Sequence, residues 1–395
     1  MRRIKGLGEL PHLAGKRVLV RVDYNVPLTR GLVASGDDAK LRASLPTIGH
    51  LTERKAKVIL VSHLGRPDGH ERGLSLAPVA SRLEKLLRRK VLFVRPDITA
   101  DHGAEDVLSK LRDGQVALLE NVRFYPGEER NDRFFARRLA SLADLYVDDA
   151  FAVAHRKHAS NVGVTRYLRS YAGSLMEAEV HNLNRLLKRS GSPFVVLLGG
   201  AKISTKLPTL KKLLKVADEV LVGGGLANSL LRARGLSVGR SEVPRQEVMA
   251  ARRLVRSRKI VLPSDVLAAS SLSAGARTRV ASVDDVRRDE FVLDIGPETT
   301  RDFAARIKRA RTIVWNGPMG VFEIPQFSHG TMSLARIVAA RSSGRAFGVV
   351  GGGETIVALE QTGMSDYVDF VSTGGGAMLE YLSGHTLPGI APLLA

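Results

Sequence analysis

Cationic side chains stand at or just after four β-branched segments in the first half of the chain. Arg21, His63, Arg123 and Arg156 each belong to a different one of these segment ends. Parallel strands place their ligands beyond their carboxyl ends, so we expect these four side chains to converge. The arginine fork suits bidentate recognition of phosphate and carboxylate. The spacing therefore predicts a cationic cup for a small acid with several negative charges.

Further polar residues accompany these strand ends. Asp23 and Asn25 alternate with Arg21 and would share one side of an extended chain. Gly65 permits close approach of the backbone. His/Asp pairs could instead ligate a metal, but no H-x-x-x-H helix with a nearby carboxylate supports zinc. The absence of G-x-S-x-G also disfavours a serine nucleophile.

Glycine clusters end the candidate strands of the second half, at 199–200, 223–225, 351–353 and 374–376. A helix that begins in such a turn points free N–H groups at an anion. Lys202 and Lys206 are four residues apart in GGAKISTK, which resembles a phosphate-binding turn but lacks the P-loop pattern. Several such turns suggest a nucleotide, and the missing G-x-G-x-x-G disfavours a dehydrogenase.

The elements that position these residues alternate regularly between strands and helices over 395 residues. That alternation predicts parallel α/β sheets, and the length predicts two or three domains. A composition shift separates the halves, with a connector helix at 173–191. In the stretch GDDAKLRASLPTIGHL, Pro46 is predicted in the first turn of a helix.

Composition limits the function classes. The chain has no cysteine, no secretory leader and no run of eighteen apolar residues, so we expect a cytoplasmic protein without disulfides or membrane spans. The net charge of +20 favours anionic partners, nucleic acid among them. Aromatic residues make up only 5%, which argues against a stacking platform for single strands.

Long motifs spread over nearly the whole chain resemble those of the phosphoglycerate kinases. They are RVDYNVPL, RASLPTI, SHLGRP, LLENVRFYPGEE, DAFAVAHRKHAS, GGAKISTKL, WNGPMGVFE, GGGETIVAL and STGGGAMLEYLSG. The resemblance implies Mg²⁺-dependent, reversible phosphoryl transfer between 1,3-bisphosphoglycerate and ADP, which gives 3-phosphoglycerate and ATP. It also implies a monomer whose partners are these small molecules, with no nucleic acid and no membrane.

The resemblance further implies an α/β fold of two Rossmann-like domains with parallel sheets, facing a central cleft and joined by the connector helix. We expect a 3-phosphoglycerate-binding domain over 1–172, to which 382–395 return, and a nucleotide-binding domain over 192–381. Domain closure would use the connector helix and adjoining loops as a hinge.

Site residues follow from the motifs by position. The resemblance implies that the glycerate and its phosphates meet Arg21, Asp23, Asn25, Lys40, His63, Leu64, Gly65, Arg66, Arg123, His155 and Arg156. It implies that the nucleotide meets Gly200, Ala201, Lys202, Lys206, Gly224, Gly225, Asn316, Pro318, Glu323, Gly351, Gly352, Gly353, Glu354 and Thr355. The catalytic set would be Lys40, Lys206, Arg156, Gly352 and Gly375, with Glu354 as the metal ligand.

Two departures from the family pattern bear on catalysis. Lys40 stands where the family has Arg, and Glu354 stands where Asp usually ligates the metal. Alignment of RASLPTI gives the catalytic position to Lys40 and leaves Arg42 as a surface or salt-bridge residue. These departures keep open a paralogue with poor or altered catalysis, and the charge keeps open a basic nucleic-acid-binding protein; the motif density favours an active kinase.

Overall fold

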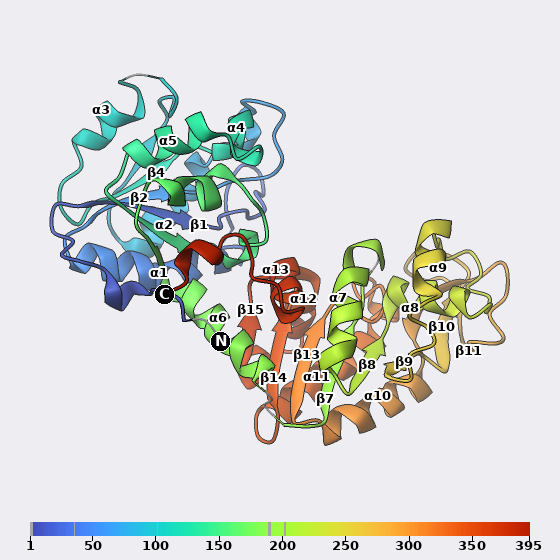
Figure 1. Cartoon of the computed structure of the whole chain (residues 1–395). Coiled ribbons are helices and arrows are strands. Elements are labelled where there is room, and N and C mark those ends of the chain that lie inside the picture. Colours follow the sequence, from blue (N-terminus) through green and yellow to red (C-terminus); the bar gives the residue numbers. More distant parts are fainter. Residues whose placement is uncertain (1–2, 35, 101, 189–190, 201–202) are drawn as a thin grey trace. The chain divides into compact units, whose positions relative to one another are not determined.

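The computed structural model describes residues 3–34, 36–100, 102–188, 191–200 and 203–395. The chain forms two compact units (Figure 1). The N-terminal unit extends to His181 and includes Thr386–Ala395, and the C-terminal unit is Asn182–His385. The division falls inside α6 (Ser174–Leu187), within the segment that was predicted as the connector. The last residues join the N-terminal unit through bonds such as Lys5 N to the Leu393 carbonyl, at 2.8 Å.

The N-terminal unit is built on a six-stranded parallel sheet in the order β3-β4-β2-β1-β5-β6. Its strands are β1 (Arg17–Val22), β2 (Lys57–Val61), β3 (Val91–Val94), β4 (Val116–Leu119), β5 (Leu145–Asp149) and β6 (Ser170–Ala172). Its other helices are α1 (Ala39–Glu53), α2 (Ala77–Leu87), α3 (Ala104–Ser109), α4 (Pro126–Glu129) and α5 (Arg133–Ser141). Arg21 is in register with Val61 and Asp148, so the carboxyl ends of three central strands align.

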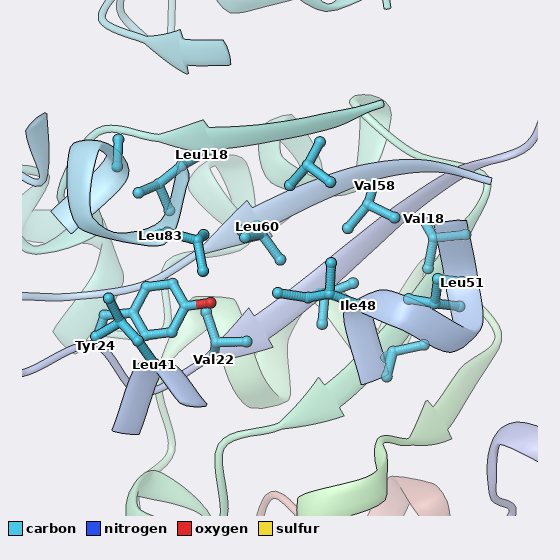
Figure 2. Close-up of a cluster of buried hydrophobic side chains, with 14 of the residues drawn as sticks. Val18, Val22, Tyr24, Leu41, Ile48, Leu51, Val58, Leu60, Leu83 and Leu118 are labelled. Atoms are coloured by element: carbon cyan, nitrogen blue, oxygen red, sulfur yellow. The ribbon is translucent and has the colours of Figure 1, made fainter. Parts of the chain in front are cut away.

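Two buried clusters hold this sheet from both faces. On one face Val18, Val22 and Leu60 pack with Ile48 and Leu51 of α1 (Figure 2). A second cluster covers the other face and includes residues of α5. Both faces of the sheet are buried, which explains why the strands read as continuous apolar runs. The packing fixes the strand ends that carry the polar residues.

The predicted start of α1 was wrong. The helix begins at Ala39, so Pro46 lies in its interior, two turns after the start. The start of the helix is stabilised by the buried Asp38 carboxylate, which accepts from Arg42 Nε of α1 itself at 2.7 Å and from Arg82 Nε of α2 at 2.8 Å. The local contact with Arg42 and the tertiary contact with Arg82 help to offset the backbone bond that Pro46 cannot make. As a result Lys40 and Arg42 both lie in the helical first turn, on different sides.

The C-terminal unit contains a second six-stranded parallel sheet, in the order β15-β14-β13-β7-β8-β9. Its strands are β7 (Phe194–Leu198), β8 (Glu219–Val222), β9 (Ile260–Val261), β13 (Thr312–Asn316), β14 (Phe347–Gly351) and β15 (Phe370–Ser372). Its helices are α7 (Ile203–Val216), α8 (Gly224–Ala233), α9 (Arg245–Ala251), α10 (Pro297–Arg309), α11 (His329–Ser342), α12 (Gly353–Gln361) and α13 (Gly376–Leu382). Two six-stranded parallel sheets confirm the predicted α/β class.

The same unit also has an antiparallel sheet that the sequence did not predict. It consists of β10 (Asp265–Ala269), β11 (Thr278–Ser282) and β12 (Phe291–Ile295), in the order β11-β10-β12. Its edge strand β11 is largely exposed, and Arg279 ties it to Glu290 at 2.7 Å. Few apolar residues mark such a strand, so the alternation of strong strands and helices concealed it. No helix within the described part of the chain is long and apolar enough to cross a membrane.

Candidate active site

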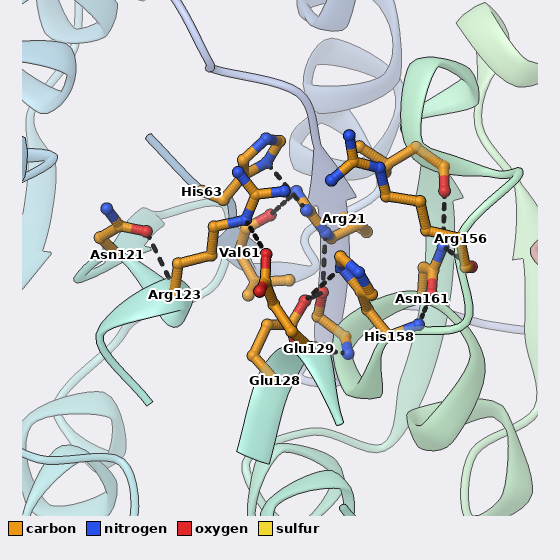
Figure 3. A network of polar contacts seen from close by, with 12 residues as sticks. Arg21, Val61, His63, Asn121, Arg123, Glu128, Glu129, Arg156, His158 and Asn161 are labelled. Atoms are coloured by element: carbon orange, nitrogen blue, oxygen red, sulfur yellow. Dashed lines mark hydrogen bonds and ion pairs between the residues drawn. The ribbon is translucent and has the colours of Figure 1, made fainter. Parts of the chain in front are cut away.

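The structure brings four predicted basic residues of the N-terminal unit together at the carboxyl end of its sheet. We call Arg21, His63, Arg123, Arg156 and His158 the basic cluster (Figure 3). Arg21 is only 1% exposed, and its Nη2 lies 3.1 Å from His63 Nδ1. Burial, followed by the charges of Arg21 and Arg123, holds the pKa of His63 well below its usual range. His63 is therefore neutral in the folded protein.

Glu128 at the back of this cluster was missed by the sequence reasoning. It is fully buried in α4 and accepts from Ser160 N at 2.9 Å and from Ser160 Oγ at 2.6 Å. Burial raises the pKa of Glu128, while the charge of Arg21 and the bonds from Ser160 oppose that rise. The motif PGEE contains this residue, but nothing in its pattern marks the first glutamate as buried.

The arginines of the cluster exceed their acidic partners. Arg123 Nε lies 3.2 Å from Glu129 Oε1, and Arg123 Nη1 donates to the Gly65 carbonyl. Arg156 Nε contacts His155 Nε2 at 3.4 Å, and no carboxylate pairs with Arg156 among the residues that the structure describes. Burial and then the charge of Arg156 lower the pKa of Arg123. Guanidiniums held this close without matching carboxylates make a site that attracts an anion.

The remaining predicted residues of this site lie around the cluster. His155 is half-buried beside Arg156, and Arg66 is exposed. Arg66 and Arg123 line a cavity of about 350 Å³, together with the loop around Pro126. Leu64 is a core side chain, and its backbone is held by Asn121, whose Nδ2 donates to the Leu64 carbonyl at 2.8 Å. Leu64 therefore contributes its backbone, and not its side chain, to the site at the carboxyl end of the sheet.

Lys40 and Arg42 have separate environments. Lys40 Nζ donates to Asp23 Oδ2 at 2.8 Å and to the Asn25 carbonyl at 3.0 Å. Asn25 Oδ1 accepts from Gly65 N at 2.9 Å, so these residues join the edge that carries His63. Arg42 is instead paired with Asp38, which lies in the turn before α1. The geometry places Lys40 at the strand ends and Arg42 outside them.

The C-terminal unit contains a cavity of about 700 Å³ at the carboxyl ends of its parallel strands. Six predicted residues line it: Gly200, Gly224, Gly225, Pro318, Glu323 and Glu354. The rest of the lining was not predicted, and part of it comes from β12 and the segment before α9. Phe291, Val292 and Leu293 of β12 line the cavity, and the Arg240 guanidinium lies 4.8 Å from the centre of the Phe291 ring. An apolar strand and glycine turns in one cavity suit a nucleotide, whose base is flat and whose phosphates bind N–H groups.

Lys206 lies beside this cavity and is inserted between two strand ends. Its Nζ donates to the carbonyl of Gly199, after β7, and reaches the Asn316 carbonyl, at the end of β13, at 3.4 Å. Burial lowers the pKa of Lys206 to about 8, and the charge of Glu354 opposes that shift. The neighbouring predicted residues Ala201 and Lys202 lie outside the described part of the chain.

Several glycines at the strand ends of this unit occupy backbone positions that disfavour a side chain. Gly352 has φ +99°, and a Cβ there would meet Asn316 Nδ2 at 2.9 Å. A Cβ at Gly375 would come within 4.0 Å of Gly352 Cα, so these two glycines lie close together. Gly317, which was not predicted, has φ +95°, and its Cβ would collide with the Gly199 carbonyl oxygen. The turns are therefore fixed by contact as well as by backbone conformation.

Two other predicted side chains support these turns from within, and a third predicted residue begins the helix that follows. Asn316 is buried, and its Nδ2 donates to the carbonyl of Gly351 at 2.8 Å. Thr355 is also buried, and its Oγ1 accepts from Gly317 N at 2.6 Å. Gly353 begins α12 directly after Gly352. Asn316 and Thr355 thus hold the β13 and β14 turns together.

The described residues contain no group of three His, Asp or Glu side chains that could hold a metal by themselves. Glu354 is the predicted ligand, and it lines the cavity in the first turn of α12. Mg²⁺ is commonly bound through one or two carboxylates together with the phosphates of a nucleotide. A cavity carboxylate in the first turn of α12 fits Mg²⁺ that arrives with the nucleotide.

The fold and these two sets of residues are those of an α/β phosphotransferase. A family model described as phosphoglycerate kinase matches residues 8–385. The chain belongs to the phosphoglycerate kinase family, and it is a kinase of glycolysis.

Relatives and solved structures agree with this family. The chain is 50% identical over 385 residues to the phosphoglycerate kinase of Thermomicrobium roseum, with 96% of each chain covered. It is 46% identical to that of Moorella thermoacetica, with 96% of this chain and 97% of the relative covered. The structure is similar to phosphoglycerate kinase from Coxiella burnetii, with a TM-score of 0.83, 40% identity and 99% of each chain covered. It is also similar to that from Pyrococcus horikoshii, with a TM-score of 0.86, 32% identity and coverage of 99% and 98%.

Proposed function

We propose that the basic cluster binds the phosphate and carboxylate groups of 3-phosphoglycerate, and that the C-terminal cavity binds ADP or ATP. The protein then transfers a phosphoryl group reversibly between 1,3-bisphosphoglycerate and ADP. The observation that carries this proposal is the set of buried or half-buried guanidiniums at Arg21, Arg123 and Arg156, which exceeds its carboxylate partners. A guest with several negative charges would neutralise that excess.

Phosphoryl transfer needs positioning and charge neutralisation rather than a covalent protein group. Arg156 and Arg123 would bind the acid. Lys40 would break its ion pair with Asp23 and contact the transferring phosphoryl group. Lys206, when protonated, would neutralise the phosphates of the nucleotide. Glu323 is exposed at the cavity wall, where it can accept from a ribose hydroxyl. The N–H groups at Gly352 and Gly353 would donate to phosphate oxygens, with Gly375 beside them.

Mg²⁺ would be held by Glu354 and the nucleotide phosphates, and it would supply charge neutralisation at the transferred group. The acidic side chain is longer than the usual Asp, so we expect the metal to be bound less rigidly. We further propose that the protein acts as a cytoplasmic monomer. The absence of cysteine in the sequence supports a reducing compartment.

Two single variants test the assignment of one substrate to each unit. Arg156→Ala leaves no carboxylate orphaned, because Arg156 pairs with none among the described residues. Loss of a charge-assisted hydrogen bond costs about 1.5–3 kcal/mol, or roughly 10- to 150-fold in affinity. We expect this loss for 3-phosphoglycerate in titration calorimetry, with ADP affinity unchanged. Glu323→Ala should show the reverse pattern.

The matched control is Arg112→Ala, because Arg112 is exposed and precedes β4 at the amino end of the same sheet. It should change neither affinity by more than about twofold. Equal weakening of both ligands by Arg156→Ala, or weakening of 3-phosphoglycerate by Arg112→Ala, would contradict the assignment.

A further inference from the structure

The backbone turn behind the basic cluster is a single π-helical turn, Ala159–Gly163, and it carries two buried polar residues that no substrate role uses. Ser160 is fully buried, and every polar atom it has is engaged: N and Oγ donate to Glu128, and its carbonyl accepts from Tyr146 Oη at 2.9 Å. Single π-helical turns occur frequently at functional sites. We therefore expect this turn to have a functional role.

We propose that Ser160, anchored by Glu128, is a positioning residue that orients Arg21 and thereby fixes His63 as the Nε2–H tautomer. His63 then acts toward the bound acid as a hydrogen-bond donor. The consequence for substrate binding rests on the proposed function of the basic cluster. The consequence for the tautomer concerns the free protein alone.

The Ser160 hydroxyl lies between Arg21 and Glu128. A serine hydroxyl has one hydrogen and two lone pairs. The Oγ atom lies 2.6 Å from Glu128 Oε1 and 2.8 Å from Arg21 Nε. Arg21 can only donate, so the hydroxyl hydrogen goes to the Glu128 carboxylate and a lone pair receives Arg21 Nε. The direction of both bonds is thus determined.

Hydrogen bonds within the protein fix the orientation of the Arg21 guanidinium. Arg21 Nη1 donates to the carbonyls of Val22 and Val61, and Nη2 lies 3.1 Å from His63 Nδ1. With the bond from Nε to Ser160, four of its five N–H groups are used inside the protein. Arg21 therefore acts mainly by holding other groups, while Arg123 and Arg156 keep more donors available for a ligand.

The contact with Arg21 sets the tautomer of His63. Because Arg21 carries no acceptor, His63 Nδ1 must be the acceptor and cannot bear a hydrogen. The ring hydrogen then resides on Nε2. Burial of His63 and the neighbouring cations keep the ring neutral, which is consistent with one hydrogen on one nitrogen. A neutral Nε2–H group is a donor suited to a carboxylate or phosphate oxygen.

The adjacent residue performs a parallel task for Arg156. Asn161 Nδ2 donates to the carbonyls of Val153 and Arg156, each at 2.9 Å, and Asn161 Oδ1 accepts from His158 N at 3.0 Å (Figure 3). The π-helical turn thus supports two sides of the cluster through consecutive residues. This arrangement gives a reason for a π-helical turn behind a cationic site.

The direct test is nitrogen NMR of the full-length wild-type protein labelled at histidine, with His63 assigned by a His63→Gln variant. We expect the spectrum of the Nε2–H tautomer, with Nδ1 as an unprotonated acceptor, in the absence of substrate. An Nδ1–H tautomer, or a cationic ring at pH 7, would overturn the proposal. This result does not depend on whether the cluster binds 3-phosphoglycerate.

Ser160→Ala removes the acceptor for Arg21 Nε. We expect a mixed tautomer signal for His63 and an increase of about tenfold in KM for 3-phosphoglycerate, with KM for ATP and kcat within twofold. Ser160→Thr keeps the hydroxyl and should restore both. If Ser160 only stabilises the fold, Ser160→Ala will lower the midpoint of thermal unfolding and leave the tautomer and the KM unchanged, which overturns the positioning role.

Ser44→Ala is the matched control. Ser44 is also a buried serine of the N-terminal unit, and its hydroxyl bonds to Tyr24 Oη at 2.8 Å and to the Leu41 carbonyl. Its loss should lower stability without changing the His63 tautomer. If Ser160→Ala does not fold, the wild-type spectrum and Glu128→Gln, which should also mix the tautomers, still decide the proposal.

Discussion

The burial of Lys206 makes a prediction in which activity and stability respond to pH in opposite directions. The pKa of Lys206 falls from 10.5 to about 8 because the ammonium group loses water. One pKa unit corresponds to about 1.4 kcal/mol, so holding this charge in the folded protein costs about 3 kcal/mol. A charge on Lys206 that is kept beside a nucleotide cavity at this cost in free energy indicates a functional role for that charge.

The sign of the stability effect follows from proton linkage. The folded pKa lies below the unfolded value, so between about pH 8 and 10.5 the unfolded chain binds more protons at this group. The contribution of Lys206 to the free energy of unfolding therefore rises by about 3 kcal/mol as pH rises through that window. Lys206→Met lacks this contribution, so the stability difference between wild type and variant should change by that amount.

Trp315 provides the measurement. It is the single tryptophan, it is fully buried, and it precedes Asn316, whose carbonyl faces Lys206. Urea unfolding monitored by its fluorescence at pH 7 and at pH 10.5 reports the C-terminal unit for both proteins. Parallel pH dependence of wild type and Lys206→Met would refute the argument.

Activity should change the other way. If protonated Lys206 neutralises the nucleotide phosphates, kcat/KM for the nucleotide falls above a pH of about 8 in wild type. Lys206→Arg retains its charge throughout this range and should lack that fall, whatever its absolute rate. A wild-type profile that stays flat to pH 10 would show that the proton on Lys206 is not required.

Two further predictions concern the positions where this chain departs from its family. Lys40→Arg should match or exceed wild-type turnover, because the guanidinium fork can meet both Asp23 and a phosphoryl oxygen. Arg42→Ala should keep most activity, because Arg42 pairs with Asp38. A coupled assay with 3-phosphoglycerate and MgATP compares the two variants, and a major loss of activity in Arg42→Ala would show that the wrong cation was assigned. Glu354→Gln should raise the Mg²⁺ concentration needed for half-maximal turnover about tenfold at fixed ATP, and an unchanged Mg²⁺ dependence would remove Glu354 from the metal site.

Local pattern predicted the parts of the fold that packing reinforces. The central strands of both parallel sheets, such as β2, β4 and β7, are continuous apolar runs because they are buried on both faces. The pattern failed where tertiary contacts override it. Pro46 suggested a helix start, but the pairing of Asp38 with Arg42 and Arg82 begins the helix earlier. The antiparallel sheet was not predicted because its edge strand is largely exposed and carries few apolar residues.

By itself the sequence determined which residue types end the parallel strands, since these ends follow from local periodicity and a topology that directs them to one edge. The convergence of Arg21, His63, Arg123 and Arg156 could be predicted on that basis. Only the tertiary structure decided what stands behind them. Ser160 meets Arg21, and Glu128 meets Ser160, across long sequence separations, and Phe291 lines the same cavity as the glycine turns although it comes from another sheet. Such contacts depend on how elements pack in three dimensions, which a one-dimensional pattern does not encode.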